Sequence, residues 1–395
     1  MRPVALTGFG PVTPLGVGWE ALLEGLAAGG DGFEGPLKTL DATAFPGLRA
    51  AECRAFDPGA ILGATGLRNN DRVTKLLLAS ARLGLAHAGV KRDGQWLAHG
   101  PEKAGVVAST VYGSLESITE LDRVARLEDP RYLNPGRFPN TVINSALGFV
   151  SIWEDLRALN ATVTNGLCGP LDAVFTAGLY LHARRADVVL VGGADALSET
   201  LAVGFDANGV LCPPGGRYAP GEPGSEGVRL GEGSLLAVAE RPESARARGA
   251  TVLAAVTGYA SVFEPPEAGA LTSTRPEALL RAADAALADA GLRMDAVDAM
   301  LSQANGHPAL DALDRCLWDR LPPEAAVVAP KARFGEALAA SGALTLALAA
   351  GWFRGVAPGP SLRGDPTKTP RTVLVAIAGL HGNASALVLQ RENTV

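Results

Sequence analysis

The sequence contains few of the residues from which metal centres and disulfide frameworks are built. Its 395 residues include only four cysteines and five histidines. The cysteines, at positions 53, 168, 212 and 316, lie far apart and form no Cys-x-x-Cys pair. This spacing excludes a zinc ribbon or a disulfide framework and indicates free thiols in a reducing compartment. We therefore expect the protein to bind no metal and no cofactor.

The chain also lacks a basic stretch and a long apolar run. Its formal net charge is −6, so nucleic acid is not an expected partner. No segment approaches the ~18 uninterrupted apolar residues of a membrane span. Residues 1–6 lead directly into a strand, so we expect no signal peptide before the fold. These absences predict a cytoplasmic globular protein that binds neither nucleic acid nor a membrane.

Apolar residues make up 47% of the chain, which is enough to bury a sizeable core. They gather in short continuous runs separated by stretches with helical spacing. The expected strands are residues 4–7, 104–109, 187–191, 299–303 and 372–378. Continuous rather than alternating apolar strands predict a parallel sheet that is covered by helices on both faces.

The strand and helix pattern before residue 233 is similar to the pattern after residue 234. This similarity predicts two halves, residues 1–233 and 234–395, and suggests an internal duplication. In the second half, Thr274 and Glu277 form a capping pattern for a helix that ends at Gly291.

One stretch in the first half has the pattern of a nucleophile elbow. Residues 162–164 are β-branched and predict a buried strand, which breaks at Asn165-Gly166. A helix is expected from Gly169-Pro170, because proline suits the first helical turn. A strand, a tight turn and a helix can present a side chain to a pocket beside helix N–H groups. Cys168 stands at this corner, which is typical of a cysteine acyltransferase.

Several stretches, in order, resemble the β-ketoacyl synthases of the thiolase-like superfamily. They are residues 7–16, Asp71-Arg72, residues 112–116, Asn134-Pro135, residues 138–140, residues 192–194, residues 230–233, Lys331 and residues 379–384. The resemblance extends from residue 4 to about residue 390. It implies an α/β, thiolase-like αβαβα five-layered fold of two pseudo-repeated halves that works as a dimer.

The resemblance also implies a catalytic cysteine and two histidines, and none of the three is retained. Counting back from Asp187-Val188 puts the nucleophile position at Leu167, whereas alignment on the elbow glycine puts it at Gly166. Asn305 stands at the first histidine position. Glu336 stands at the second, five residues after the retained Lys331.

This loss resembles the chain-length factor, or β subunit, of type II polyketide synthases, including relatives in aryl polyene-type systems. Such a subunit implies a heterodimer with a catalytic ketosynthase and contact with an acyl carrier protein. The glutamine that many of these subunits carry at the nucleophile position is absent here. By the same resemblance, Tyr112, Gly113, Leu115 and Phe138 fall near the subunit interface and the acyl tunnel, where bulky side chains would limit chain length.

Alternative roles for single residues stay open at this point. Cys168 is either a displaced nucleophile, assisted by His307, His381 or Glu336, or a small buried hydrophobic residue. Glu336 is either a base or a side chain that fills the old histidine site, paired with Lys331 or Arg333.

A third interpretation is a protein that only recruits acyl carrier protein. Carrier proteins are usually acidic and prefer basic surfaces, so this function would need a local patch. The candidate patch contains Arg72, Lys75, Arg184 and Arg185.

Overall fold

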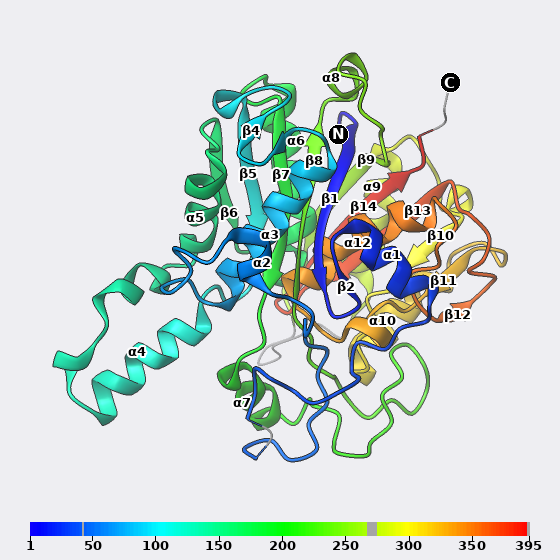
Figure 1. Cartoon of the computed structure of the whole chain (residues 1–395). Helices are drawn as coiled ribbons and strands as arrows, with labels where there is room; N and C mark the ends of the chain where they lie inside the picture. Colours follow the sequence, from blue (N-terminus) through cyan, green and yellow to red (C-terminus); the bar gives the residue numbers. More distant parts are fainter. Residues whose placement is uncertain (42, 267–274, 393–395) are drawn as a thin grey trace.

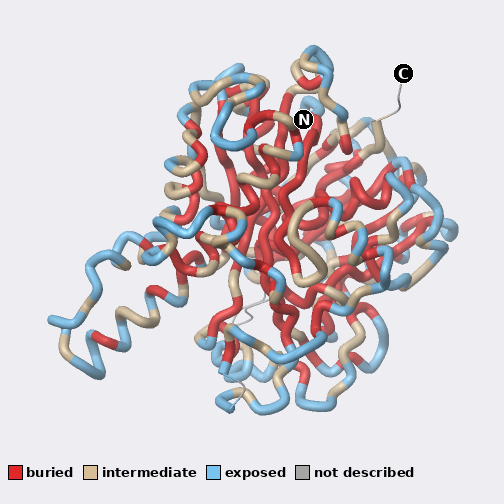
Figure 2. Tube along the Cα trace, viewed as in Figure 1, coloured by how far each residue is buried: buried red, intermediate tan, exposed pale blue. Residues whose placement is uncertain are grey.

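The computed structural model describes residues 1–41, 43–266 and 275–392. One mixed sheet of twelve strands runs through these residues, in the order β12-β11-β10-β13-β14-β9-β1-β8-β7-β5-β6, with β2 paired to β1. The prediction of a parallel sheet is therefore wrong for part of it. Antiparallel strands also carry continuous apolar runs here, because helices cover them on both faces (Figures 1 and 2).

Strands of the first half occupy one end of the sheet. In spatial order they are β1 (Val4–Thr13), β8 (Gly233–Glu240), β7 (Val188–Asp195), β5 (Ala104–Ser109) and β6 (Leu159–Val163). β8 runs antiparallel to both β1 and β7, whereas β7, β5 and β6 run parallel.

Strands of the second half repeat this arrangement. They are β9 (Ala254–Phe263), β14 (Asn383–Gln390), β13 (Thr372–Ala378), β10 (Ala299–Leu301) and β11 (Ala326–Val328), again antiparallel up to β13 and parallel beyond it. β1 and β9 join the two sets, and β12 (Ser361–Arg363) extends the second. The short strands are β2 (Gly16–Val17), β3 (Lys91–Arg92) and β4 (Gln95–Trp96).

The repeated strand order supports an internal duplication. β8 contains the predicted boundary at residues 233 and 234, yet it pairs with β1 and β7 of the first half. We propose that the division between the halves lies after β8.

Helices form three layers around the strands. α6 (Gly169–His182) and α12 (Ala339–Trp352) pack on each other in the middle, and every residue of α12 is buried. α3 (Arg72–His87) and α5 (Ser145–Glu154) cover the outer face of the first half. α9 (Glu277–Asp289) and α10 (Pro308–Trp318) cover the outer face of the second. The predicted thiolase-like fold class is therefore confirmed, with helix layers alternating with strand layers (Figure 1).

The remaining helices are peripheral. They are α1 (Trp19–Ala27), α2 (Pro58–Leu62), α4 (Leu115–Leu127), α7 (Glu199–Ala207), α8 (Pro242–Ala247) and α11 (Lys331–Phe334), with 3-10 turns at Pro101–Lys103, Pro130–Tyr132, Pro135–Thr141, Gly166–Cys168 and Met294–Ala296. α4 and the chain after it project from the body (Figure 1). None of the helices in the described ranges is long and apolar enough to cross a bilayer.

Some predicted elements differ in position. The strand before the elbow is β6, which ends at Val163 and is only half-buried, because it lies at the end of the sheet with a single neighbour. The strand predicted to reach Gln303 ends at Leu301. The predicted cap Thr274 lies outside the described residues.

Candidate functional site

The elbow joins β6 to α6 through Asn165 and one 3-10 turn. Gly166 has φ +55°, a left-handed value that favours glycine, although a Cβ there would meet no atom within 4 Å. The next two side chains are buried, and Leu167 is 7% exposed. Pro170 lies in the first turn of α6, as its position in the sequence predicted.

Cys168 is held in an apolar environment. Its Sγ donates a hydrogen bond to the carbonyl oxygen of Ile377 at 3.4 Å, and its side chain is fully buried. Burial, aided by the negative charge of Asp172, raises the pKa of the thiol to about 12. A thiol with this pKa stays protonated near neutral pH and is a poor nucleophile. Cys168 therefore packs as a small hydrophobic residue.

A cavity of about 20 Å³, room for roughly one water molecule, lies beside the elbow. Leu167 lines it together with Asn305 and Lys331, whereas Gly166 and Cys168 do not. The other lining residues are Leu279, Gln303, Leu310, Asp314, Ile377 and Ala378. The structure thus places three residues that the sequence predicted for the site, Leu167, Asn305 and Lys331, around one small cavity with almost no free space.

The carboxylate of Glu336 links Lys331 and Asn305 through hydrogen bonds. Its Oε2 accepts from Lys331 Nζ at 2.8 Å and from Asn305 Nδ2 at 3.0 Å. Its Oε1 accepts from the backbone N–H of Leu338 at 2.9 Å and from Ser341 Oγ at 3.2 Å. The side chain is 2% exposed. All four donors point at one carboxylate, so Glu336 is a bound structural anion with no free lone pair aimed at a substrate.

Three other candidate residues take no part in this arrangement. Arg333, the alternative partner of Glu336, donates instead to the carbonyl oxygen of Leu26 at 2.9 Å. The backbone N–H of His307 donates to Asn305 Oδ1, and the imidazole does not line the small cavity. His381 is exposed in the closing loop.

Two carboxylates that the sequence interpretation did not include support the Asn305 loop. Asp311 accepts hydrogen bonds from the backbone N–H groups of Asn305, Gly306 and Gly221, and burial raises its pKa. Asp314 accepts from Ser302 Oγ, and burial raises its pKa to about 6. Their i, i+3 spacing on α10, which places both on one helix face, was the available signal.

Asp195 was also not predicted as a site residue. It is the last residue of β7, is 3% exposed, and lies beside the turn that carries Tyr112. Its oxygens accept hydrogen bonds from Thr110 Oγ1 and from the backbone N–H groups of Val111 and Tyr112. Desolvation by burial raises the pKa of Asp195 to about 6. A carboxylate shortly after the apolar run of residues 187–191 was the available signal of its role.

The residues expected near the subunit interface are partly exposed in this chain. The side chain of Tyr112 is 41% exposed and that of Phe138 is 69% exposed. Gly113 has φ +61°, and a Cβ there would come within 3.3 Å of the Ile143 side chain. Leu115 starts α4 and is half-buried. Phe138 lies in the 3-10 turn Pro135–Thr141, which follows α4 in the chain, and α4 projects from the body (Figure 1).

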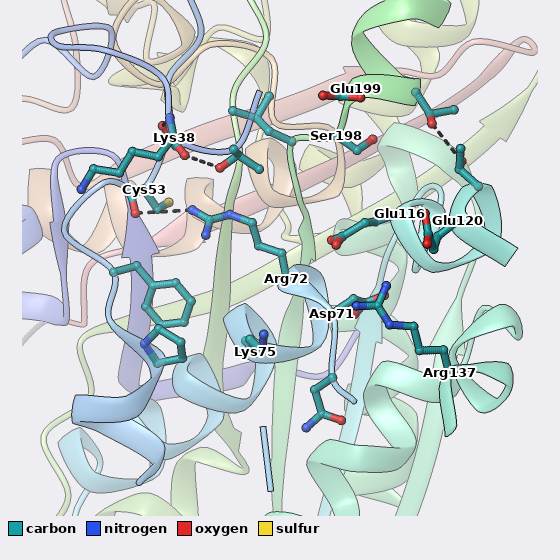
Figure 3. A pocket seen from close by; sticks show the side chains of 18 of the residues that line it. Lys38, Cys53, Asp71, Arg72, Lys75, Glu116, Glu120, Arg137, Ser198 and Glu199 are labelled. Atoms are coloured by element: carbon teal, nitrogen blue, oxygen red, sulfur yellow. Dashed lines mark hydrogen bonds between the residues drawn. The ribbon is translucent and has the colours of Figure 1, made fainter. Parts of the chain in front are cut away.

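A large polar cavity, of about 650 Å³, lies between the start of α3, the helix α4 and the start of α7 (Figure 3). Its charged lining residues are Lys38, Glu52, Arg54, Arg68, Asp71, Arg72, Lys75, Glu116, Glu120, Arg123, Arg137 and Glu199. Figure 3 shows Arg72 between Cys53 on one side and Asp71 with Arg137 on the other. In the part of the chain that the structure describes, the His, Cys, Asp and Glu side chains form no group of three that could hold a metal ion.

The predicted basic patch is divided. Arg72 is bound to Glu232, which is fully buried, with Arg72 Nε donating to one carboxylate oxygen at 2.6 Å. Arg184 and Arg185 follow α6 and do not line the large cavity. Lys75 does line it. Arg68 and Arg137, which were not predicted, join Lys75 there, and among the described residues none of these three side chains has a hydrogen bond or an ion pair.

Comparisons with known proteins place these features in a family. Residues 1–245 match the model of the β-ketoacyl synthase N-terminal domain. The 3-oxoacyl-[acyl-carrier-protein] synthase 2 of Coxiella burnetii is 30% identical over 87% of this chain and 84% of its own length. The tetracenomycin polyketide synthase ketoacyl synthase beta subunit of Streptomyces glaucescens is 31% identical over 99% of this chain and 98% of its own.

A solved structure has a similar fold over nearly the whole length. The ishigamide ketosynthase/chain length factor superposes with a TM-score of 0.85 and 26% identity, covering 99% of this chain and 100% of that one. The similarity to chain-length factors that the sequence motifs predicted is therefore confirmed.

Proposed function

Because the chain belongs to the β-ketoacyl synthase family, we propose that it is a non-catalytic ketosynthase-like subunit of the chain-length-factor type. It pairs with a catalytic β-ketoacyl-acyl-carrier-protein synthase and shapes the acyl tunnel of that partner during polyketide, polyene or fatty-acid-like chain elongation. The observation that carries this proposal is the filled site, where Leu167, Asn305 and Lys331 meet around about 20 Å³ of space.

We assign the nucleophile position to Leu167, since it lines the cavity with Asn305 and Lys331 while Gly166 does not. A leucine side chain forms no thioester. Asn305 donates and accepts hydrogen bonds but transfers no proton near neutral pH. Glu336 is held by four donors. The position of the family's catalytic site therefore holds no nucleophile, no base and no histidine that could stabilise an oxyanion.

The first half presents a surface that suits a partner subunit. β6 pairs only with β5, so among the described residues its outer edge has no neighbouring strand. α5 packs beside β6, where Asn160 Nδ2 donates to Ser151 Oγ at 2.7 Å. Large exposed hydrophobic residues lie on α4, α5 and the segment between them: Ile118, Leu127, Tyr132, Phe138, Val142, Ile143 and Ile152. An open strand edge beside exposed apolar side chains is typical of a protein interface.

The names of similar proteins support a two-subunit assembly. One relative is described as a ketoacyl synthase beta subunit, and one solved structure as a ketosynthase/chain length factor. In such a pair, Tyr112, Gly113, Leu115 and Phe138 would lie against the partner, and their side chains would form the wall that limits the growing acyl chain. The exposure of Tyr112 and Phe138 in the single chain agrees with this placement.

Acyl carrier protein is the proposed second partner. The large cavity is lined by the cationic side chains of Arg68, Lys75 and Arg137, which form no hydrogen bond or ion pair among the described residues. An acidic carrier helix would be attracted to such a group of cations. Arg72 is excluded from this role, because its guanidinium is already neutralised by Glu232.

The test is co-expression of this chain with the catalytic ketosynthase of its system, followed by size-exclusion mass analysis and a malonyl-carrier elongation assay. The proposal predicts a 1:1 complex, elongation only when both chains are present, and no loss of activity in Cys168→Ala. A homodimer of this chain that elongates alone and loses activity in Cys168→Ala would establish an acyltransferase instead. Binding of the carrier protein without any ketosynthase partner would favour the recruitment function.

A further inference from the structure

Asp195 organises the turn that carries Tyr112. Thr110 Oγ1 donates to it at 2.8 Å, and the N–H groups of Val111 and Tyr112 donate at 3.0 and 3.3 Å. Thr110 Oγ1 in turn accepts from the backbone N–H of Gly113 at 2.9 Å. Every backbone N–H from residue 111 to residue 113 thus points to Asp195 or to the hydroxyl that it holds. Hydrogen bonds to a carboxylate are the stronger kind, so this one side chain fixes the path of the turn.

The same carboxylate also holds the second half of the chain. Asp195 Oδ2 accepts from the N–H of Ala339 at 3.0 Å, where α12 begins. Asp195 and Ala339 are 144 positions apart in the sequence. Asp195 has no ion pair with a cation within the described ranges. Because it is buried without a counter-charge, these N–H and O–H donors are what stabilise it there.

Glu336 shapes the backbone immediately before this contact. It accepts from the N–H of Leu338, a residue with φ +54°. Such a backbone conformation is unfavourable for leucine and persists only where surrounding contacts enforce it. Glu336 on one side and Asp195 on the other supply these contacts. A continuous path therefore runs from Lys331 through Glu336, Leu338-Ala339 and Asp195 to Tyr112.

We propose that Asp195 is the positioning residue for Tyr112, and that Glu336 acts on the same turn through Leu338-Ala339. In this proposal, the residues at the position of the catalytic site hold the turn that carries Tyr112 in place. That turn forms part of the wall that limits product length. This inference rests on the proposed function, because that function gives Tyr112 its role in the tunnel wall.

The first arm of the test measures how firmly this turn is held in the full-length chain, by amide hydrogen exchange of residues 110–114. Asp195→Asn is expected to increase exchange by roughly tenfold to a hundredfold, since a hydrogen bond to a charged group is lost. Glu336→Gln is expected to produce a smaller increase, and the double variant less than the product of the two. Thr110→Val, which keeps the carboxylate and the side-chain volume, is the milder variant should Asp195→Asn not fold.

The matched control is Asp298→Asn. Like Asp195, Asp298 accepts hydrogen bonds from two consecutive backbone N–H groups, those of Arg371 and Thr372 at 2.8 and 2.9 Å. It precedes β10, at the opposite end of that strand from the Asn305 loop. Its substitution is expected to leave the exchange of residues 110–114 unchanged. Exchange of residues 110–114 in the Asp195→Asn and Thr110→Val variants no faster than in Asp298→Asn would overturn the positioning role.

The second arm measures the distribution of product lengths made by the assembled complex, at equal concentrations of complex. Asp195→Asn and Glu336→Gln are expected to shift the ratio of longer to shorter products at least twofold, whereas Asp298→Asn leaves it unchanged. An unchanged ratio in a fully assembled Asp195→Asn complex overturns the positioning role alone. Failure of the wild-type chain to form any complex with a ketosynthase overturns the proposed function, and the positioning role with it.

Discussion

The ion pair between Lys331 and Glu336 offers a direct energetic test of the filled site. Lys331 Nζ lies 2.8 Å from Glu336 Oε2, and the two side chains are 7% and 2% exposed. Lys331→Met leaves a buried carboxylate with only neutral donors, and Glu336→Gln leaves a buried ammonium without its paired carboxylate. Breaking a buried pair in this way typically costs about 3–5 kcal/mol of the free energy of unfolding. We expect losses of that size for each single variant.

The double variant Lys331→Met/Glu336→Gln removes both charges and is expected to recover much of this loss. Replacing both partners of a buried pair is often nearly neutral. A double variant that costs less than either single variant requires a coupling energy larger than one single loss, which is about 3 kcal/mol or more. The measurement is equilibrium unfolding in guanidinium chloride, followed by circular dichroism. The control is Arg126→Met, which breaks the exposed Arg126–Asp122 pair and should cost below about 1 kcal/mol. Single variants no worse than this control, or a double variant equal to their sum, would refute a tightly coupled buried pair.

Three further predictions concern other parts of the chain. Cys168 should react with iodoacetamide only after unfolding, because its pKa is about 12 and its side chain is buried, and mass spectrometry of native and denatured protein measures this. Asp314, whose pKa burial raises to about 6, retains a proton in the folded state that the unfolded state releases near 3.8. As the pH rises from 4 to 6, wild-type stability should therefore fall by about 2 kcal/mol because of this group, and Asp314→Asn should lack this loss in denaturation curves across that range. Ile152→Glu, on the 75% exposed side chain of α5, should abolish the complex with the ketosynthase, whereas Leu97→Glu, at a 58% exposed position directly after the β3–β4 hairpin, should leave its size-exclusion mass unchanged.

Local sequence patterns determined the elbow. The β-branched run, the Asn165-Gly166 break and Pro170 each restrict the backbone within a few residues, so strand, turn and helix follow from them. The pattern did not show that β6 lies at the end of the sheet. That position depends on which strands pair, and β5 is its one neighbour although residues 110–158, with α4 and α5 among them, separate the two strands in the chain.

Residue type also carries the proposal that the catalytic set is missing. Neither leucine nor glycine carries a nucleophile, so this conclusion holds whichever of Leu167 and Gly166 occupies the position. Only the structure separated the two. A shift of one residue at the start of a helix turns the side chain by roughly a third of a turn, and it is Leu167 that meets Asn305 and Lys331.

The partners of charged residues were decided by tertiary structure. From the sequence, Glu336 had two candidate cations, and the chain direction at α11 brings Lys331 to it while Arg333 reaches Leu26. Arg72 belonged to a candidate basic patch in the sequence, and the fold pairs it with the buried carboxylate of Glu232.

The sequence by itself determined the fold class and the family, because these depend on residue types and on their order. The tertiary structure decided which side chains pack around the small cavity beside the elbow. It also decided which backbone segments Glu336 and Asp195 hold. Asp195 shows why: its donors come from residues 84 and 144 positions away, at Val111 and Ala339. Contacts between such distant residues leave no periodicity or spacing in the sequence, and they form only when the chain folds.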